Sequence, residues 1–364
     1  MTKALLFPYH PDIDIIAKHK NMLNGYEIVG VISYKDDDKV VDNLHAQLGI
    51  ERLAYELMLE KCDEIIVLEN YRNFNDEKYY QVIEDALAKD IRIVITPSAE
   101  KQLDLCKYVG QYETLKNSYD LLDYFETDHQ VRVDLNAESI LYDIPFPVVG
   151  IMGMGKNCGK FETELLAKNV LEENFDVITL SSNPLGVLFG TYTFPQFFYE
   201  DISLESKILR LNHHLKRLTD KHNADVILIG MPEGIGPFRK AETNHFAEYA
   251  LAITSAVQVD IAILCTYFLG EGITSNSIAD YAHAISKRFG ARVIGVAMSR
   301  TMFEVSAEEK NIVYEFLDED YIDKYYPDVG ESNDVVFVRL DNAENARWDI
   351  KRCISILAGN VAAI

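Results

Sequence analysis

Short apolar runs alternate with longer amphipathic segments along most of the chain. Runs rich in Val, Ile and Leu are typical of strands that are buried on both faces of a parallel sheet. In the first part of the chain the pattern predicts strands at residues 3–9, 26–34, 64–68 and 91–96, and helices at 53–61 and 78–88. Strands that alternate with helices indicate a Rossmann-like α/β domain, here over residues 1–110.

The same alternation predicts a second, larger α/β domain over residues 147–364. Its expected strands are 148–152, 176–180, 225–229, 261–265, 293–297 and 335–340, and its expected helices are 160–173, 204–222, 240–256, 275–289, 307–318 and 342–357. Residues 111–146 between the domains are polar and aromatic, so they are expected to form a connecting segment. Two short extended pieces there, 130–135 and 139–142, leave room for a hairpin before Pro145 and Pro147 force an extended chain.

Charge and cysteine usage exclude several classes of protein. The 364 residues carry a net charge of −23, and such an acidic surface repels nucleic acid and anionic membranes. No run reaches the roughly 18 apolar residues that a membrane span needs, and the amino-terminal residues do not resemble a signal peptide. The five cysteines are widely spaced and form no C-x-x-C pair, so a reduced cytoplasmic location is expected.

One segment carries a specific chemical signal. The sequence PVVGIMGMGKNCGKFETELLA, residues 147–167, reads as a strand, a glycine-rich turn and an amphipathic helix. Gly153, Gly155 and Gly159 let consecutive backbone N–H groups face inward as an anion nest, and the helix adds its positive amino-terminal end. Lys160 then places an ammonium beside the β- and γ-phosphates of a nucleotide. The pattern therefore predicts a P-loop, although a glycine-rich turn that binds nothing is the plain alternative.

This P-loop departs from the usual pattern at two points. Five residues, instead of four, separate Gly153 from Gly159, and this longer loop resembles that of the dethiobiotin synthetase branch of P-loop enzymes. Phe161 stands where a Ser or Thr normally binds Mg²⁺, so Glu162 or Thr163 is expected to replace it. The expected nucleotide-binding residues are Gly153, Gly155, Lys156, Asn157, Cys158, Gly159, Lys160, Phe161, Glu162 and Thr163.

A second chemical element is expected after the strand at residues 225–229. The magnesium-binding Asp that P-loop proteins carry at the end of this strand is replaced by Gly230. Glu233 follows in a Pro-Glu-Gly turn that resembles the Glu-Gly element of the dethiobiotin synthetase branch. We therefore expect Lys160 and Glu233 as catalytic residues, and Thr163, Glu162 and Glu233 as metal ligands. A solvated turn carboxylate is the alternative for Glu233.

Two further regions bear on the ligand. Residues 181–195, SSNPLGVLFGTYTFP, are too apolar for an idle loop and follow a strand, where substrate loops lie in such folds, although a packed connection also fits. No Asn-Lys-x-Asp motif marks guanine, so ATP and GTP both stay open, with ATP favoured. The front domain lacks the G-x-G-x-x-G fingerprint, so NAD is not implied there.

The motifs GMGKNCGKFE, SSNPLGVLFG, GMPEGIGPF and NHFAEYA together resemble the clostridial-type peptide maturation system proteins. This resemblance implies, as partners, a Cys-rich ribosomal precursor peptide and its maturation enzymes. Separately, relatives in the P-loop branch that the loop resembles often pair subunits across the nucleotide site, and this analogy suggests a homodimer.

Two hypotheses follow for the function. The first is an NTP-dependent enzyme, either an ATPase or a ligase that activates a carboxylate. The second is a non-catalytic scaffold that binds a nucleotide or another anion, and Phe161 and Gly230 are the evidence for it.

Overall fold

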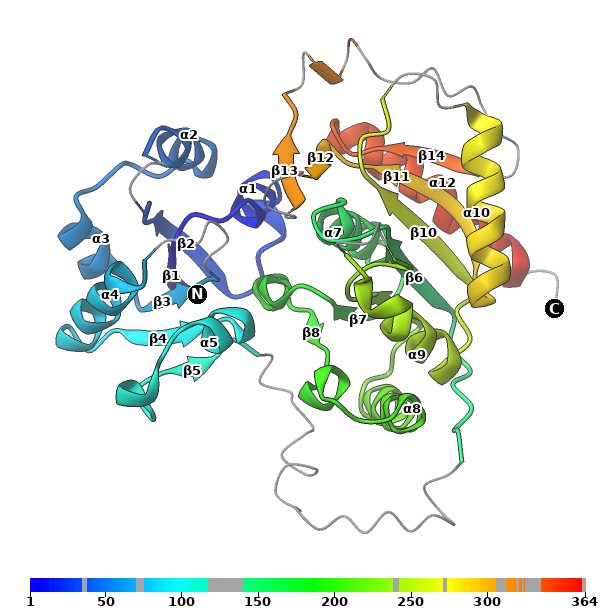
Figure 1. Cartoon of the computed structure of the whole chain (residues 1–364), viewed down its shortest axis with the longest axis horizontal. Coiled ribbons are helices and arrows are strands. Elements are labelled where there is room, and N and C mark those ends of the chain that lie inside the picture. Colours follow the sequence, from blue (N-terminus) through cyan, green and yellow to red (C-terminus); the bar gives the residue numbers. More distant parts are fainter. Residues whose placement is uncertain are drawn as a thin grey trace. The chain divides into compact units, whose positions relative to one another are not determined.

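The computed structural model describes residues 1–34, 38–69, 75–116, 140–237, 242–270, 274–305, 312–318, 321–322, 324 and 335–361. The chain forms two compact units (Figure 1). The first comprises Met1–Ser118 and Pro184–Thr193, and the second comprises Tyr119–Asn183 and Phe194–Ile364. Both are built on parallel β-sheets, which confirms the predicted fold class of two α/β units.

The first unit is built on a five-stranded sheet of order β2-β1-β3-β4-β5, whose neighbouring strands pair in parallel. Its elements are β1 (Thr2–Phe7), α1 (Asp12–Lys18), η1 (Lys20–Met22), β2 (Tyr26–Val31), α2 (Asp38–Leu48), α3 (Tyr55–Lys61), β3 (Glu64–Val67), α4 (Glu77–Ala88), β4 (Arg92–Ile95), α5 (Pro97–Gln102), η2 (Cys106–Tyr108) and β5 (Glu113–Thr114). The order 2-1-3-4-5 is that of flavodoxin-like sheets, in which ligands bind at the carboxyl ends of the strands.

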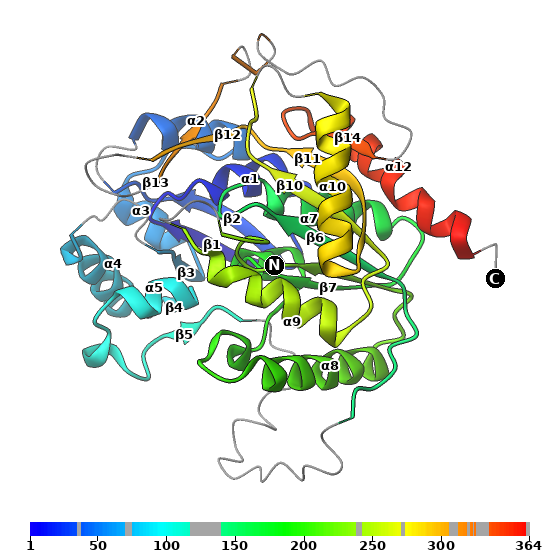
Figure 2. The same ribbon diagram turned by 45° about the vertical axis from the view of Figure 1, so that its right-hand side comes forward.

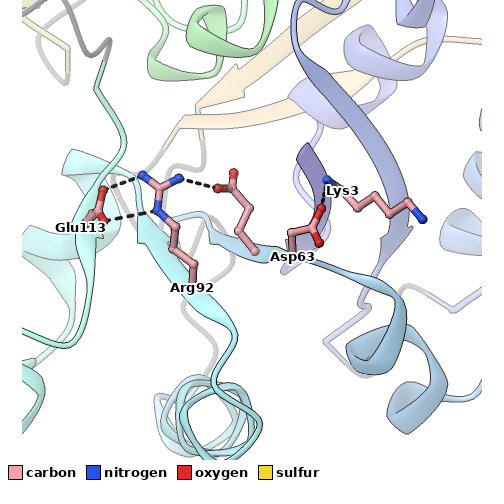
Figure 3. A network of polar contacts seen from close by, with 5 residues as sticks. Lys3, Asp63, Arg92 and Glu113 are labelled. Carbon is pink, nitrogen blue, oxygen red and sulfur yellow. Dashed lines mark hydrogen bonds and ion pairs between the residues drawn. The ribbon is translucent and has the colours of Figure 1, made fainter. Parts of the chain in front are cut away.

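A polar network ties the starting ends of these strands together. The guanidinium of Arg92, on β4, donates to both carboxylate oxygens of Glu113 at 3.2 and 2.6 Å, and to the buried carboxylate of Glu64 at 3.0 Å (Figure 3). Beside it, the backbone N–H of Lys3 donates to Asp63 at 2.8 Å. These contacts lie at the end of the sheet opposite to that where ligands gather, so the network serves the fold.

The second unit contains six strands of one sheet, in the order β14-β11-β10-β6-β9-β7. These strands are β6 (Val148–Gly153), β7 (Val177–Ser181), β9 (Val226–Gly230), β10 (Ile261–Thr266), β11 (Arg292–Met298) and β14 (Val336–Arg339). β6 runs parallel to β10 on one side and to β9 on the other. All six residues of β6 are buried, which explains its continuous apolar sequence. Because β6 lies between β10 and β9, the loop that follows β6 starts at the middle of the sheet.

The helices of this unit form two packed groups. One contains α7 (Lys160–Leu171) and α12 (Ala343–Val361), and the other contains α8 (Leu204–Lys221), α9 (Glu248–Ala256) and α10 (Ser275–Phe289) (Figure 2). Short 3₁₀ segments of this unit occur at η4 (Gln196–Tyr199) and η5 (Asn244–Ala247), whereas η3 (Pro184–Phe189) and β8 (Tyr192–Thr193) belong to the first unit. Within the described ranges, no helix combines the length and the apolar character needed to cross a membrane.

Two predicted elements are wrong. A helix was expected at residues 307–318, but β13 (Ile312–Phe316) pairs antiparallel with β12 (Thr301–Val305). Phe303 and Tyr314 in this hairpin pack on the ring of Tyr267, and this contact outweighs the helical spacing. The helix expected at 240–256 begins only at Glu248, because Asn244 to Ala247 adopt left-handed backbone conformations. The hairpin expected from residues 130–135 and 139–142 falls mostly outside the described residues, and the described part, residues 140–142, is not assigned to a strand.

Candidate phosphate-binding site

The predicted P-loop joins the central strand β6 to helix α7. Gly159 is the residue immediately before α7 and has a φ of 84°, a left-handed conformation that strains residues with a side chain. Asn157 also has a positive φ, 56°, which Asn tolerates better than most residues. The loop therefore curls tightly and places the first turn of α7 over the end of β6, as an anion nest requires.

Close neighbours explain why the three predicted glycines are glycines. A Cβ on Gly155 would lie 2.5 Å from the hydroxyl of Tyr267, and one on Gly159 would lie 2.5 Å from a methyl group of Leu340. On Gly153, it would lie 2.6 Å from the thiol of Cys158. The Tyr267 hydroxyl also donates to the carbonyl of Lys156 at 2.6 Å, so a side chain from the region after β10 fixes the loop.

The ammonium of Lys160 lies inside this loop. It donates to the carbonyl of Gly155 at 3.2 Å and to the carbonyl of Glu233. The thiol of Cys158 is buried and donates to the same Gly155 carbonyl at 3.1 Å, which agrees with a small residue in a tight turn. Lys160 is thus positioned by backbone oxygens at the place where the P-loop pattern expects phosphates.

The turn that contains Glu233 is attached to the P-loop. Glu233 has a positive φ of 55°, and its carboxylate lies 3.7 Å from the ammonium of Lys156. The N–H of Ile235 donates to the Gly153 carbonyl at 2.9 Å. The buried amide of Asn244 donates to the carbonyls of Met154 and Gly236, at 3.1 and 2.8 Å. The structure therefore brings the Glu233 carboxylate near Lys156 and the Glu233 carbonyl to Lys160, and a catalytic role for Glu233 stays a prediction.

The three residues after Lys160 differ in burial and in hydrogen bonding. Phe161 is buried, and Glu162 is half-buried in the first turn of α7. Thr163 is fully buried, its hydroxyl donates to the Gly159 carbonyl at 2.9 Å, and it accepts from the Cys265 thiol at 3.4 Å. A metal-binding role for Glu162, Thr163 or Glu233 stays a prediction.

A carboxylate that the sequence reasoning missed lies beside the loop. Glu164 is 1% exposed, and its oxygens accept hydrogen bonds from the hydroxyls of Ser181 at 2.5 Å and Ser182 at 2.9 Å. A Cβ on Gly230 would overlap this carboxylate. Glu164 therefore places a carboxylate at the end of β9, where position 230 lacks one. Lys160 and Glu164 are four residues apart and therefore lie on one face of α7, but this spacing alone does not indicate that the carboxylate is buried.

Burial dominates the electrostatics of Glu164. It raises the pKa of this carboxyl to about 7, while the two serine hydroxyls and the Lys160 ammonium act in the opposite direction. Burial also raises the pKa of Tyr267, so this hydroxyl stays protonated and can donate to the loop.

The loop at residues 181–195 is divided between the two units. Ser181 and Ser182 contact Glu164, whereas Pro184–Thr193 belongs to the first unit. There, the N–H of Asn24 donates to the carbonyl of Leu188 at 2.8 Å. Of the loop at residues 181–195, only the first residues, Ser181 and Ser182, thus contact the candidate site.

No protein-family model and no curated protein matches this sequence. Among solved structures, a DUF1611 family protein from Anabaena variabilis is similar over 98% of this chain and 100% of its own, with 14% identity and a TM-score of 0.53. At this identity, the likeness concerns the fold. A GTPase from Pyrococcus abyssi in its apo form matches at 19% identity over 42% of this chain and 66% of its own, with a TM-score of 0.25. Chloroplast FtsY from Physcomitrella patens matches at 15% identity over 79% of both chains, with a TM-score of 0.26.

Proposed function

We propose that the second unit binds a nucleoside triphosphate at residues 153–160 and is an NTP-dependent enzyme, with ATP favoured over GTP. The observation that carries the proposal is the position of the Lys160 ammonium, held by two carbonyls inside a glycine-lined turn at the amino-terminal end of α7. Backbone N–H groups and an ammonium at this point favour the β- and γ-phosphates.

The nearby oxygen atoms suit Mg²⁺ as a partner of the nucleotide. Among the described residues, no group of three or more His, Cys, Asp and Glu side chains is placed to hold a metal. Magnesium in nucleotide sites is usually bound by one or two carboxylates, water and the phosphates themselves, so a single carboxylate suffices. Glu164 is the residue best placed to supply it, and Glu162, Thr163 and Glu233 remain the candidates from the sequence.

The chemistry assigned to the chain's own residues is charge stabilisation. Lys160 and the loop N–H groups would stabilise negative charge that develops on the phosphates. Bound Mg²⁺ would neutralise further phosphate charge. The hydroxyls of Ser181 and Ser182 donate to the two carboxylate oxygens of Glu164 and would hold this carboxylate in place. Both an ATPase and a carboxylate-activating ligase are consistent with this arrangement.

The non-catalytic scaffold remains the second candidate. Phe161 and Gly230, which stand at expected metal-ligand positions, favour it. Glu164 weakens that argument, because its carboxylate lies where a side chain at Gly230 would lie. The motif resemblance adds the proposal that either activity serves maturation of a Cys-rich ribosomal peptide, in a protein that acts as a homodimer.

The test measures nucleotide binding and turnover separately. Purified full-length protein would be titrated with ATP and GTP, and phosphate release would be followed with and without Mg²⁺. Lys160→Ala should weaken nucleotide binding at least tenfold, whereas Lys216→Ala, on α8, should not. Binding that depends on Lys160 without turnover would favour the scaffold. Absence of any nucleotide binding would refute both candidates.

A further inference from the structure

The first carbonyl groups of the P-loop are all hydrogen-bonded. Each of the four carbonyls at residues 153–156 accepts from a donor of the second unit. The donors are the N–H of Ile235 for Gly153, the side-chain amide of Asn244 for Met154, the ammonium of Lys160 for Gly155 and the hydroxyl of Tyr267 for Lys156, at 2.9, 3.1, 3.2 and 2.6 Å. A carbonyl oxygen that turns toward a phosphate repels it, because both carry negative charge. Pairing these carbonyls therefore favours the binding of an anion by the loop N–H groups.

Two of these donors are side chains from outside the P-loop motif. Asn244 lies just before α9, and Tyr267 follows β10. Both are buried, with exposed fractions of 0% and 1%. The orientation of two loop carbonyls is thus set by two buried side chains that are distant from the motif in sequence.

These two contacts also set the direction of the neighbouring N–H groups. In a planar trans peptide, the carbonyl of one residue and the N–H of the next point in opposite directions. The Met154 carbonyl points to Asn244, so the N–H of Gly155 points away from Asn244. The equivalent contact of Tyr267 directs the N–H of residue 157 away from the Tyr267 ring. Because Gly155 has no side chain, its peptide would rotate readily once the Asn244 amide is removed.

Asn244 begins a strained stretch of backbone that keeps this amide in place. Asn244, His245, Phe246 and Ala247 have φ values of 46°, 47°, 53° and 68°, a left-handed conformation that costs free energy in residues with a side chain. Such strain persists only where the surrounding structure fixes it. Here the Asn244 amide also donates to the Gly236 carbonyl at 2.8 Å, and α9 begins directly after Ala247. Asn244 is therefore a fixed support for the Met154 carbonyl.

We propose that Asn244 and Tyr267 are positioning residues of the nucleotide site. They hold the carbonyls of Met154 and Lys156 so that the loop presents N–H groups, and not oxygen atoms, to the phosphates. Both act through the loop backbone. This inference rests on the nucleotide binding proposed above, and it assigns part of the affinity to two segments outside the motif.

The experiment compares the affinity of full-length variants for ATP and GTP, measured by calorimetry in the presence of Mg²⁺. Asn244→Ala and Tyr267→Phe each remove one donor to the loop, so each should weaken binding about tenfold. Tyr267→Phe keeps the ring that packs against Phe303 and Tyr314, and it keeps the test valid if Asn244→Ala does not fold.

Asn212→Ala is the matched control. Asn212, on α8, is 1% exposed, and its amide donates to the carbonyls of Tyr142 and Ala256 at 3.0 and 2.8 Å. This variant also loses a buried amide with two carbonyl acceptors, but its acceptors are not in the P-loop. The folded control should bind nucleotide as tightly as wild type.

NMR gives a second readout, which a general loss of stability does not change. In nucleotide-free protein, the amide resonance of Gly155 should shift in Asn244→Ala and stay in place in Asn212→Ala. Wild-type affinity in folded Asn244→Ala or Tyr267→Phe protein would overturn the role of that residue, and so would an equal loss of affinity in Asn212→Ala. Wild-type protein that binds neither nucleotide would instead refute the proposed function, and this inference with it.

Discussion

The carboxylate of Glu164 occupies the space in which a side chain at Gly230 would begin. The two residues come from different elements, the P-loop helix α7 and the strand β9. A carboxylate at the end of β9 is what P-loop proteins use to position Mg²⁺. The chain thus has a carboxylate in this region, and it comes from the helix α7.

This relationship predicts strong coupling between the two positions. Gly230→Ala should destabilise the second unit by about 1–3 kcal/mol, because the new methyl group overlaps a buried carboxylate. The free energy of unfolding would be measured in urea, with the fluorescence of Trp348 as the signal. Trp348 is the single tryptophan and lies on α12, so it reports on the second unit.

The control for this prediction is a double-mutant cycle. In a Glu164→Ala background, Gly230→Ala should cost much less, with a coupling energy of about 1 kcal/mol or more. Additive effects of the two substitutions would show that the overlap does not determine the cost.

A second prediction concerns pH and Glu164. Its pKa is raised to about 7 in the folded protein, from an ordinary value of 4.5. Between pH 4.5 and pH 7, the folded state therefore keeps a proton on Glu164 that the unfolded state has lost. Proton binding stabilises the folded state at low pH, and this stabilisation is lost as the pH rises from about 4.5 through 7. Relative to wild type, Glu164→Gln should gain stability between pH 5 and pH 8, on the order of 3 kcal/mol. Denaturant unfolding at several pH values measures this difference. Glu172→Gln, beyond the end of the same helix, should show no such trend.

A third prediction concerns His214, which is buried in α8. Burial lowers the pKa of its ring from 6.5 to about 4, so the unfolded chain binds the proton more readily. Stability should fall as the pH drops from about 6.5 to 4, by a few kcal/mol at most. His214→Gln should flatten this part of the stability profile, and His213→Gln should preserve it. An unchanged profile in His214→Gln protein would contradict the assignment.

A fourth prediction concerns the network in the first sheet. Arg92→Ala removes the cation from the buried Glu64, so the first unit should lose about 1–3 kcal/mol, less than for a fully buried pair because Arg92 is half exposed. Burial already raises the pKa of Glu64, and the loss of Arg92 should raise it further. Hydrogen exchange of β3 and β4 measures the loss. Adding Glu64→Gln should recover part of it, and no recovery would show that the ion pair is not the cause.

Much of the fold follows from sequence periodicity. The strands β6, β9 and β10 occur where continuous apolar runs predict them, because these runs are buried on both faces. The two-residue strands β5 (Glu113–Thr114) and β8 (Tyr192–Thr193) were not predicted, because neither is a continuous apolar run. The P-loop glycines were also predictable, since the backbone requirements of an anion nest are local. The hairpin that contains Tyr314 was not, because its conformation depends on Tyr267, which is distant in sequence.

Glu164 could not be recognised from the sequence for a similar reason. A glutamate on an amphipathic helix normally faces solvent, and nothing local indicates that this one is buried. Its environment is created by Ser181, Ser182 and the missing side chain at Gly230, which come from two other segments. Only the packing of α7 on the sheet brings these groups together.

The shared space at positions 164 and 230 also constrains how this lineage could have diverged. A relative with an aspartate at the position of Gly230 has no room for a glutamate at that of Glu164, so the two residues must exchange together. The two arrangements are glycine at 230 with glutamate at 164, and aspartate at 230 with a small residue at 164. Single substitutions connect them only through a protein that has either two crowded carboxylates or none. Alignments of homologues should therefore show two alternative pairs, glycine with glutamate or aspartate with a small residue, and few sequences with a mixture.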